Sequence, residues 1–318
     1  MTALHSSPAS DMQLRPRAFA AGGPKAPPHL SNVLMGLGFV VPFVIAFSVF
    51  VLAPTAIVVV MSFTDWKLGE ATVSFAGLAN YQQLVSDRVP RISATNTILY
   101  ALMVTPISIM LGLWLAILIE SSRLGRAFFR SACFLPVVST TVAMAIVWEF
   151  LLHPTLGPVN SALLLAGLPA QRFLSDAALV LPTLAGIAIW ENAGYTMVLF
   201  MAGLKSISSE LYDAAAVDGA DRPWERFWTV TLPLLGPTLV FVVIIMLLRS
   251  FRVFETVAAL TGGGPRRASE VLLFTIYQEG FLFFQVGYAS AITVVFVLFL
   301  LVLTLVSYRL MDRSVHYQ

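Results

Sequence analysis

Charged residues are scarce in this chain. Asp, Glu, Lys and Arg make up only 11% of its 318 residues, whereas 58% are hydrophobic and the mean hydropathy is +0.84. A soluble globule of this length would need more polar surface. The net charge is only +2 and the basic residues are scattered, so there is no basic patch to bind nucleic acid. The composition predicts a protein that lies in a lipid bilayer.

Catalytic and metal-binding motifs are also missing. The single cysteine, Cys133, excludes an internal disulfide and a thiolate metal cluster, so we expect it to pack. The sequence lacks H-E-x-x-H, G-x-S-x-G and the phosphate loop G-x-x-x-x-G-K-[ST]. The glycine run Gly262–Gly264 is followed by Pro265 rather than Lys, which favours a flexible turn. We therefore expect no catalytic residue, no metal and no cofactor bound by this chain.

Hydrophobic runs long enough to cross a membrane are abundant. About 20 apolar residues are needed for a spanning helix, and continuous runs favour helices over barrel strands. The uncharged run that begins at Leu30 is much longer than the roughly 7 to 15 apolar residues of a signal peptide. Six candidate spans are 32–63, 92–119, 131–152, 177–204, 232–257 and 287–308. The sequence predicts an all-α integral membrane protein.

The chain ends and loops complete this organisation. We expect residues 1–31 to form a flexible cytoplasmic tail, 32–309 the transmembrane domain and 310–318 a second cytoplasmic tail. With the N-terminus inside, eleven Lys or Arg residues fall in cytoplasmic segments and six in external loops, a bias that favours cytoplasmic termini. Three prolines in the external segment 153–176 favour turns over a helix.

The polar interval 208–237 stands out between apolar spans. Ser208 can cap a helix and Gly219 can end it, because glycine adopts the left-handed conformation without steric cost. Asp221 can cap a second short helix with Pro223 in its first turn. The orientation predicted from the Lys and Arg residues places this helix–turn–helix on the cytoplasmic side of the membrane.

These residues also resemble a known family. The pattern is similar to the EAA loop of ATP-binding-cassette (ABC) importer permeases, in residues Asp213, Ala214, Ala215, Asp218, Gly219, Ala220, Phe227, Leu232, Pro233 and Pro237. Asp213 stands where the family usually has Glu, and the interval between Ala220 and Leu232 is one residue longer than usual, which leaves the register of the second helix open. The resemblance implies a type I importer fold, in which this loop is the coupling helix that docks into an ATPase subunit.

Other segments resemble the carbohydrate branch of that family, the maltose-type and glycerol-phosphate-type permeases. They are Asn80–Tyr81, Phe254–Glu255, Leu260–Pro265 and Gly287–Ala291. The resemblance implies import of a sugar or sugar-like solute across the bacterial inner membrane. It implies as partners a second, different permease subunit, two ATPase subunits that bind ATP and Mg, and an extracytoplasmic solute-binding protein. The alternatives are a permease for another solute and a secondary transporter, although we find no internal duplication.

Ionisable groups inside spans are candidates for the solute path, because their burial in lipid is costly. Glu191, with Trp190, Asn192 and Tyr195, has the chemistry to bind a polyol, or Glu191 pairs structurally with Arg249 or Arg252. Arg249, Arg252 and Glu255 recur every third residue, which predicts one helical face that lines a cavity or meets water. Asn96 and Thr97 are expected either in a cavity or in helix–helix hydrogen bonds.

Overall fold

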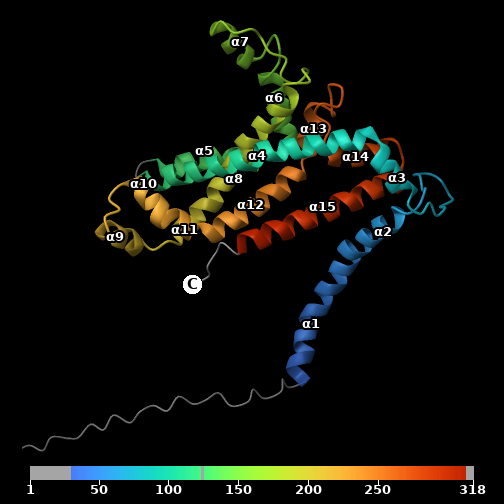
Figure 1. The fold of residues 1–318 in the computed structure, drawn as a ribbon, viewed down its shortest axis with the longest axis horizontal. Helices are drawn as coiled ribbons and strands as arrows, with labels where there is room; N and C mark the ends of the chain where they lie inside the picture. The colour runs from blue at the N-terminus through green and yellow to red at the C-terminus, as the bar shows by residue number, and fades with distance from the viewer. Residues whose placement is uncertain (1–29, 123–124, 313–318) are drawn as a thin grey trace, which may run out of the picture. The chain divides into compact units, whose positions relative to one another are not determined.

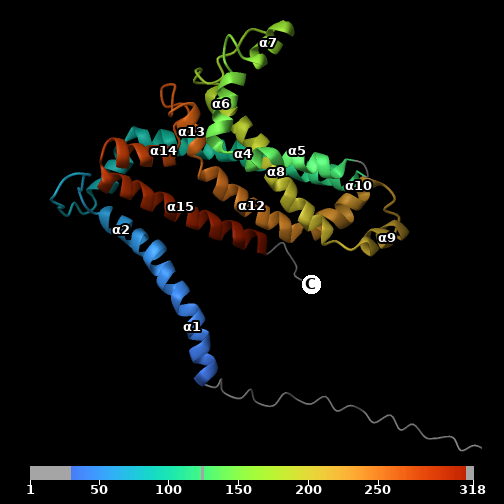
Figure 2. The same cartoon turned by 180° about the vertical axis from the view of Figure 1, so that it is seen from behind.

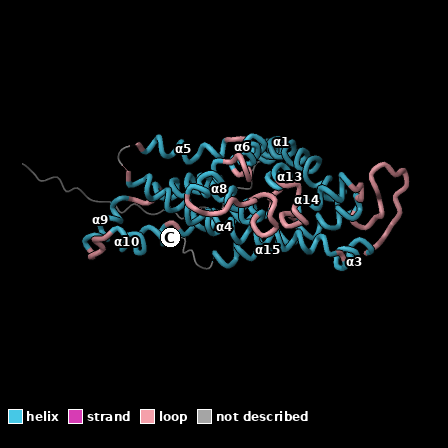
Figure 3. Tube along the Cα trace, turned by 90° about the horizontal axis from the view of Figure 1, so that it is seen from above, coloured by secondary structure: helices cyan, strands magenta, loops and turns pink. Residues whose placement is uncertain are grey.

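The computed structural model describes residues 30–122 and 125–312, so most of both expected tails lies outside the described residues. Within that part the regular secondary structure is helical, apart from one isolated antiparallel bridge between Thr64 and Phe75. Figure 3 shows the helices and their connecting loops. The chain divides into two compact units, residues 1–54 and 55–318.

In the first unit, helix α1 (Leu30–Phe47) continues through a π-helical turn, η1 (Ser48–Leu52), into the start of α2 (Ala53–Met61). The apolar stretch Gly38–Met61 is long enough to cross a membrane. This matches the expected first span.

Four long helices run beside one another in the second unit (Figures 1 and 2). They are α4 (Arg88–Ser121), α8 (Val180–Lys205), α12 (Gly236–Phe251) and α15 (Val286–Asp312). The described residues hold five candidate spans, four of them on these helices, and a sixth if one bent pair is counted. Helix α8 is the most buried of the five, so the core of this unit is built around it.

The expected third span is bent rather than straight. Residues 126–151 form α5 (Arg126–Val138) and α6 (Thr141–Leu151), whose axes differ by 100°. Thr140 accepts a hydrogen bond from the N–H of Ala143, so it caps a new helix where a continuous one was expected. Pro136, one turn before the break, removes a backbone donor. The apolar run gave the length of this segment but not its change of direction.

Helix α8 is approached closely from two sides. A Cβ on Gly112 of α4 would collide with Thr196 Oγ1 and lie 2.8 Å from the backbone nitrogen of Met197. A Cβ on Gly194 of α8 would collide with the carbonyl oxygen of Cys133 on α5. Both contacts require the absence of a side chain, and they hold α4 and α5 against α8.

Short helices connect the spans. They are α3 (Ala79–Ser86), α7 (Pro158–Leu165), α9 (Ser209–Val217), α10 (Pro223–Arg226), η2 (Phe227–Thr231), α11 (Leu232–Leu234), α13 (Glu255–Leu260), α14 (Leu272–Tyr277) and η3 (Gln278–Leu282). Helix α7 corrects the expectation of turns alone in 153–176. Its proline is the first helical residue, a position where the missing N–H costs nothing.

Candidate functional site

A polar hollow of about 1270 Å³ lies among α4, α8, α12 and α13. Such a hollow in an otherwise apolar bundle is where a solute path is expected. The polar and aromatic residues that line it are Tyr100, Thr141, Glu191, Asn192, Arg249, Arg252, Phe254, Glu255 and Thr256. Five of the seven solute-path residues expected from the sequence therefore meet at one place.

Arg249 organises one wall of this hollow. Its Nε donates to Asn192 Oδ1 at 3.0 Å, and its Nη2 lies 3.3 Å from Glu191 Oε1. The guanidinium also lies 4.6 Å from the centroid of the Tyr195 ring, within cation–π range. The structural pairing considered for Glu191 is thus present, with Arg249 as the partner, and the pair still lines the hollow.

The expected single helical face of Arg249, Arg252 and Glu255 is wrong in detail. Helix α12 ends at Phe251, and Phe254 (φ −147°, ψ −58°) precedes the new helix α13. Arg252 and Glu255 nevertheless both line the hollow. Within the described residues neither side chain forms an ion pair, so both charges remain available to a ligand.

Trp190 and Tyr195 do not line the hollow. Trp190 packs edge-to-face on Trp148, with ring centroids 5.6 Å apart, and Tyr195 lies under Arg249. Sequence reasoning missed Tyr100, which is only 3% exposed and lines the hollow from α4. Its position one turn after Asn96 on an otherwise apolar span is the signal that was available.

Asn96 and Thr97 form hydrogen bonds to the segment that precedes and begins α14. Asn96 Nδ2 donates to the carbonyls of Arg267 (3.0 Å) and Glu270 (2.9 Å), and Thr97 Oγ1 accepts from the N–H of Leu272 (2.9 Å). These bonds join α4 to the 261–271 loop and α14, and neither side chain lines the polar hollow. In the same loop Ser269 Oγ donates to Thr261 Oγ1 at 2.8 Å. This hydrogen bond links the two sides of the turn that contains the glycine run.

The expected helix–turn–helix at 208–237 is present. Ser208 Oγ accepts from the N–H of Glu210, at 3.3 Å, and caps α9. At the other end the N–H groups of Gly219 and Ala220 donate to the carbonyls of Ala216 and Ala215, the paired bonds of a Schellman motif. Gly219 has φ +96°, as this motif requires. Among the expected coupling residues, Asp213, Ala214, Asp218, Gly219 and Pro233 are exposed, while Ala215 and Ala220 are half-buried.

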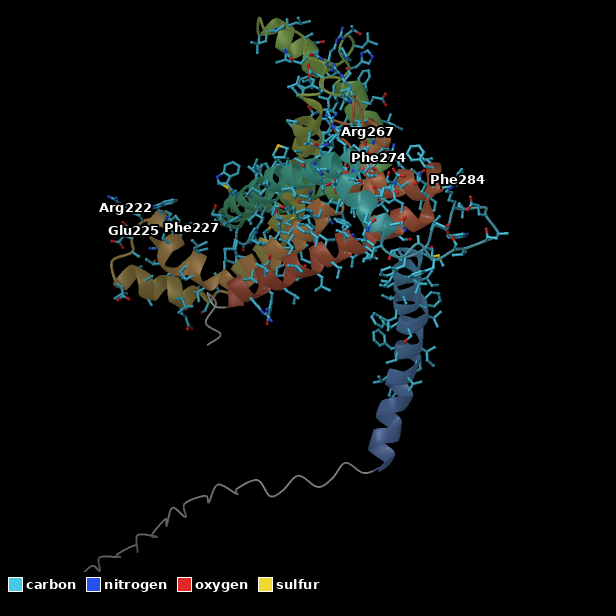
Figure 4. The ribbon with its side chains drawn as sticks, turned by 45° about the vertical axis from the view of Figure 1, so that its right-hand side comes forward. Arg222, Glu225, Phe227, Arg267, Phe274 and Phe284 are labelled. Atoms are coloured by element: carbon cyan, nitrogen blue, oxygen red, sulfur yellow. The ribbon has the colours of Figure 1, made fainter. Side chains whose placement is uncertain are left out.

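The second helix of this loop starts one residue later than expected. Its cap is Arg222 rather than Asp221, and the Arg222 N–H donates to Glu225 Oε2 at 3.1 Å. The helix then passes into the π-helical turn η2, where the N–H of Leu232 bonds to the carbonyl of Phe227. A π-turn holds more residues than an α-turn, which accommodates the extra residue before Leu232. Figure 4 shows Arg222, Glu225 and Phe227 at one end of the second unit, and Arg267, Phe274 and Phe284 toward the opposite end.

Comparison with known proteins identifies the family. Residues 108–317 match the family described as binding-protein-dependent transport system inner membrane component. The chain is 31% identical over 245 residues to the sn-glycerol-3-phosphate transport system permease protein UgpA of Agrobacterium fabrum, covering 77% of this chain and 83% of that protein. It is 33% identical over 282 residues to the probable ABC transporter permease protein YurN of Bacillus subtilis, covering 87% and 96%.

Solved structures agree with this assignment at the level of the fold. A chain of a bacterial alginate ABC transporter, in complex with an alginate pentasaccharide-bound periplasmic protein, superimposes with a TM-score of 0.78 at 23% identity, covering 89% of this chain and 96% of that one. A second structure, of a bacterial ABC transporter involved in alginate import, gives a TM-score of 0.76 at 25% identity with the same coverage. The chain therefore belongs to the inner-membrane components of binding-protein-dependent transport systems, and it is a multi-pass permease subunit of an ABC transporter.

Proposed function

We propose that this permease forms part of the import path for a sugar or sugar-like solute, an oligosaccharide, a monosaccharide or a glycerol phosphate. A relative is named for sn-glycerol-3-phosphate, and the structures of similar fold belong to transporters of alginate, an acidic polysaccharide. An extracytoplasmic solute-binding protein delivers the solute to the loops near Arg267. Both termini lie in the cytoplasm of a bacterial cell.

The polar hollow carries this proposal. A sugar needs hydrogen-bonding groups of both kinds at close range, and the hollow offers an amide, carboxylates, guanidinium groups and hydroxyls. Phe254 supplies an aromatic surface beside them, suited to the apolar face of a sugar ring. The unpaired Arg252 extends the range to solutes that carry a phosphate or carboxylate.

The exposed helix α9 supports ATP-driven coupling. It presents Asp213 and Ala214 outward, and its small side chains permit close docking into a groove of another protein. Two ATPase subunits bind ATP and Mg, because this chain has no phosphate loop, and a second, different permease completes the path. Closure of the ATPase pair moves α9 as a rigid lever and converts the hollow from inward-facing to outward-facing.

The test is to purify the intact assembly, identify its subunits by mass spectrometry and measure ATP hydrolysis with its solute-binding protein and a panel of solutes. We expect a nucleotide hydrolase and a second permease to copurify, and sugars or sugar phosphates to raise hydrolysis. Stimulation by amino acids or metal ions alone would overturn the solute class. Transport by an assembly that contains no ATPase would overturn the mechanism.

A further inference from the structure

Two neighbouring hollows on the membrane-spanning part of the second unit form one groove between α4, α14 and α15. The first, of about 470 Å³, is lined by Ala94, Thr97, Ile98, Phe251, Leu272, Val295, Phe296 and Phe299. The second, of about 550 Å³, shares Ala94, Leu272 and Val295 with it. Because they share walls, we treat them as continuous and call them the α4–α15 groove.

The first of the two hollows offers no free polar group. Thr97 is its one polar residue, and its hydroxyl donates to the Ser93 carbonyl at 2.7 Å and accepts from the N–H of Leu272 at 2.9 Å. Val295 and Phe299 remain 42% and 41% exposed. Since α4 and α15 are both membrane spans, this carbon-lined surface lies at the depth of lipid hydrocarbon.

A single charge marks one end of the groove. Arg91 is the only ionisable residue that lines it. Its Nη2 donates to the carbonyl of Val85 at 3.2 Å, and it forms no ion pair in the part of the chain that the structure describes. The guanidinium is exposed, and its remaining N–H donors suit the paired oxygens of a phosphate.

The spacing of charge and carbon matches one kind of molecule. From Arg91 to Ile98 the helix rises about 10 Å, at 1.5 Å per residue, within a leaflet whose hydrocarbon is roughly 15 Å deep. A chain of methylenes can run along the carbon-lined part while an anionic group stays at the arginine. A partner helix, about 10 Å across, has no equivalent need for the cation at the end.

We propose that the α4–α15 groove binds a glycerophospholipid, with its phosphate at Arg91 and one acyl chain against Phe296 and Phe299. The bound acyl chain then lies next to the polar hollow, separated from it by one layer of residues. Phe251 and Leu272 wall the groove, whereas the adjacent residues Arg252 and Leu273 line the hollow. A bound lipid therefore packs against the lipid-facing side of the segment that joins α12 to α13.

The test uses the intact transporter reconstituted with phosphatidylglycerol that carries a photoactivatable diazirine on its acyl chain. We expect cross-linked peptides from residues 91–98 and 292–299. Val295→Trp fills the groove and should abolish these adducts. Val297→Trp is the matched control, because Val297 is 47% exposed on the same helix but does not line the groove. Arg91→Gln should reduce labelling about fivefold, and Arg88→Gln, whose side chain does not line the groove, should not.

Two results would overturn the proposal. Equal labelling in the Val295→Trp and Val297→Trp proteins would mean that only annular lipid is detected. A benzophenone placed at Val295 that cross-links to residues 38–61 or to the second permease would mean that polypeptide covers the groove. Should Val295→Trp fail to assemble, the Arg91→Gln and Arg88→Gln pair decides alone, and equal labelling of those two would refute the lipid.

Discussion

Arg249 has two roles at once. It joins α12 to α8 through Asn192 and Glu191, and it also lines the hollow where a solute would pass. The sequence indicated that Glu191 needs a partner, because a lone carboxylate in a span is costly. It could not choose between Arg249 and Arg252, since both lie on the same apolar run and only the end of α12 at Phe251 separates them.

The Glu191–Arg249 pair can be tested by a double-mutant cycle. Arg249→Met should destabilise the protein by about 1–2 kcal/mol, because it leaves the Glu191 carboxylate uncompensated in a partly exposed site. Adding Glu191→Gln to it should recover part of that loss, since the charge left behind is gone. Thermal unfolding of the four purified proteins measures both effects. Strictly additive losses would mean that the pair contributes nothing to stability.

At the scale of the helices, length was predictable and direction was not. Uninterrupted apolar runs gave the spans to within a few residues for α4, α8 and α15, because hydrocarbon thickness sets their length. The bend at Ser139–Thr140 and the end of α12 at Phe251 were missed. Each depends on a local choice of hydrogen-bond partners inside a run whose composition does not change.

Close packing of α4 on α8 should make Gly112 intolerant of a side chain. Gly112→Val would force the helices apart at Thr196 and lower stability by about 1–3 kcal/mol, the usual cost of overpacking. Gly186→Ala is the control, because that glycine on α8 has open space around it and alanine favours the helix by roughly 0.5–1 kcal/mol. Unfolding temperatures in detergent compare the two. A tolerated Gly112→Val would contradict the close contact.

The turn after α9 should require a left-handed residue at Gly219. Gly219→Val costs about 1–2 kcal/mol in this conformation and should weaken docking of the ATPase and solute uptake while the chain still inserts. Gly219→Asn should retain most activity, because asparagine also occurs at this position of helix caps. Uptake assays and copurification of the ATPase give the readout. Normal uptake with valine would count against a coupling role for this loop.

For the molecule as a whole, the proposed sidedness can be measured with one engineered cysteine at a time. Cys133 is the only native cysteine, so Cys133→Ala gives a clean background. Val217→Cys, where the native side chain is 88% exposed, should react with a membrane-impermeant maleimide only after the membrane is opened. Phe75→Cys, at a position 82% exposed, should react in intact spheroplasts. The reverse pattern would place α9 outside the cell and end the coupling proposal.

Membership in the family could be inferred from the residues around Gly219, whereas the polar hollow could be inferred only in part. The residues that resemble the family's loop lie in one short stretch. Local conformational preferences were enough to predict the Ser208 cap of α9 and the turn at Gly219. The hollow is assembled from side chains on α4, α8, α12 and α13, so residues such as Tyr100 enter it only through tertiary packing.

The glycine contacts on α8 also restrict how this protein can move. Helices α4 and α5 reach α8 through Gly112 and Gly194, where no spare space exists for one helix to slide past another. Any cycle that keeps those contacts must carry the three helices as one block. Widening of the polar hollow then requires movement of α12 and α13. A covalent cross-link between α4 and α8 would leave the hollow free to open.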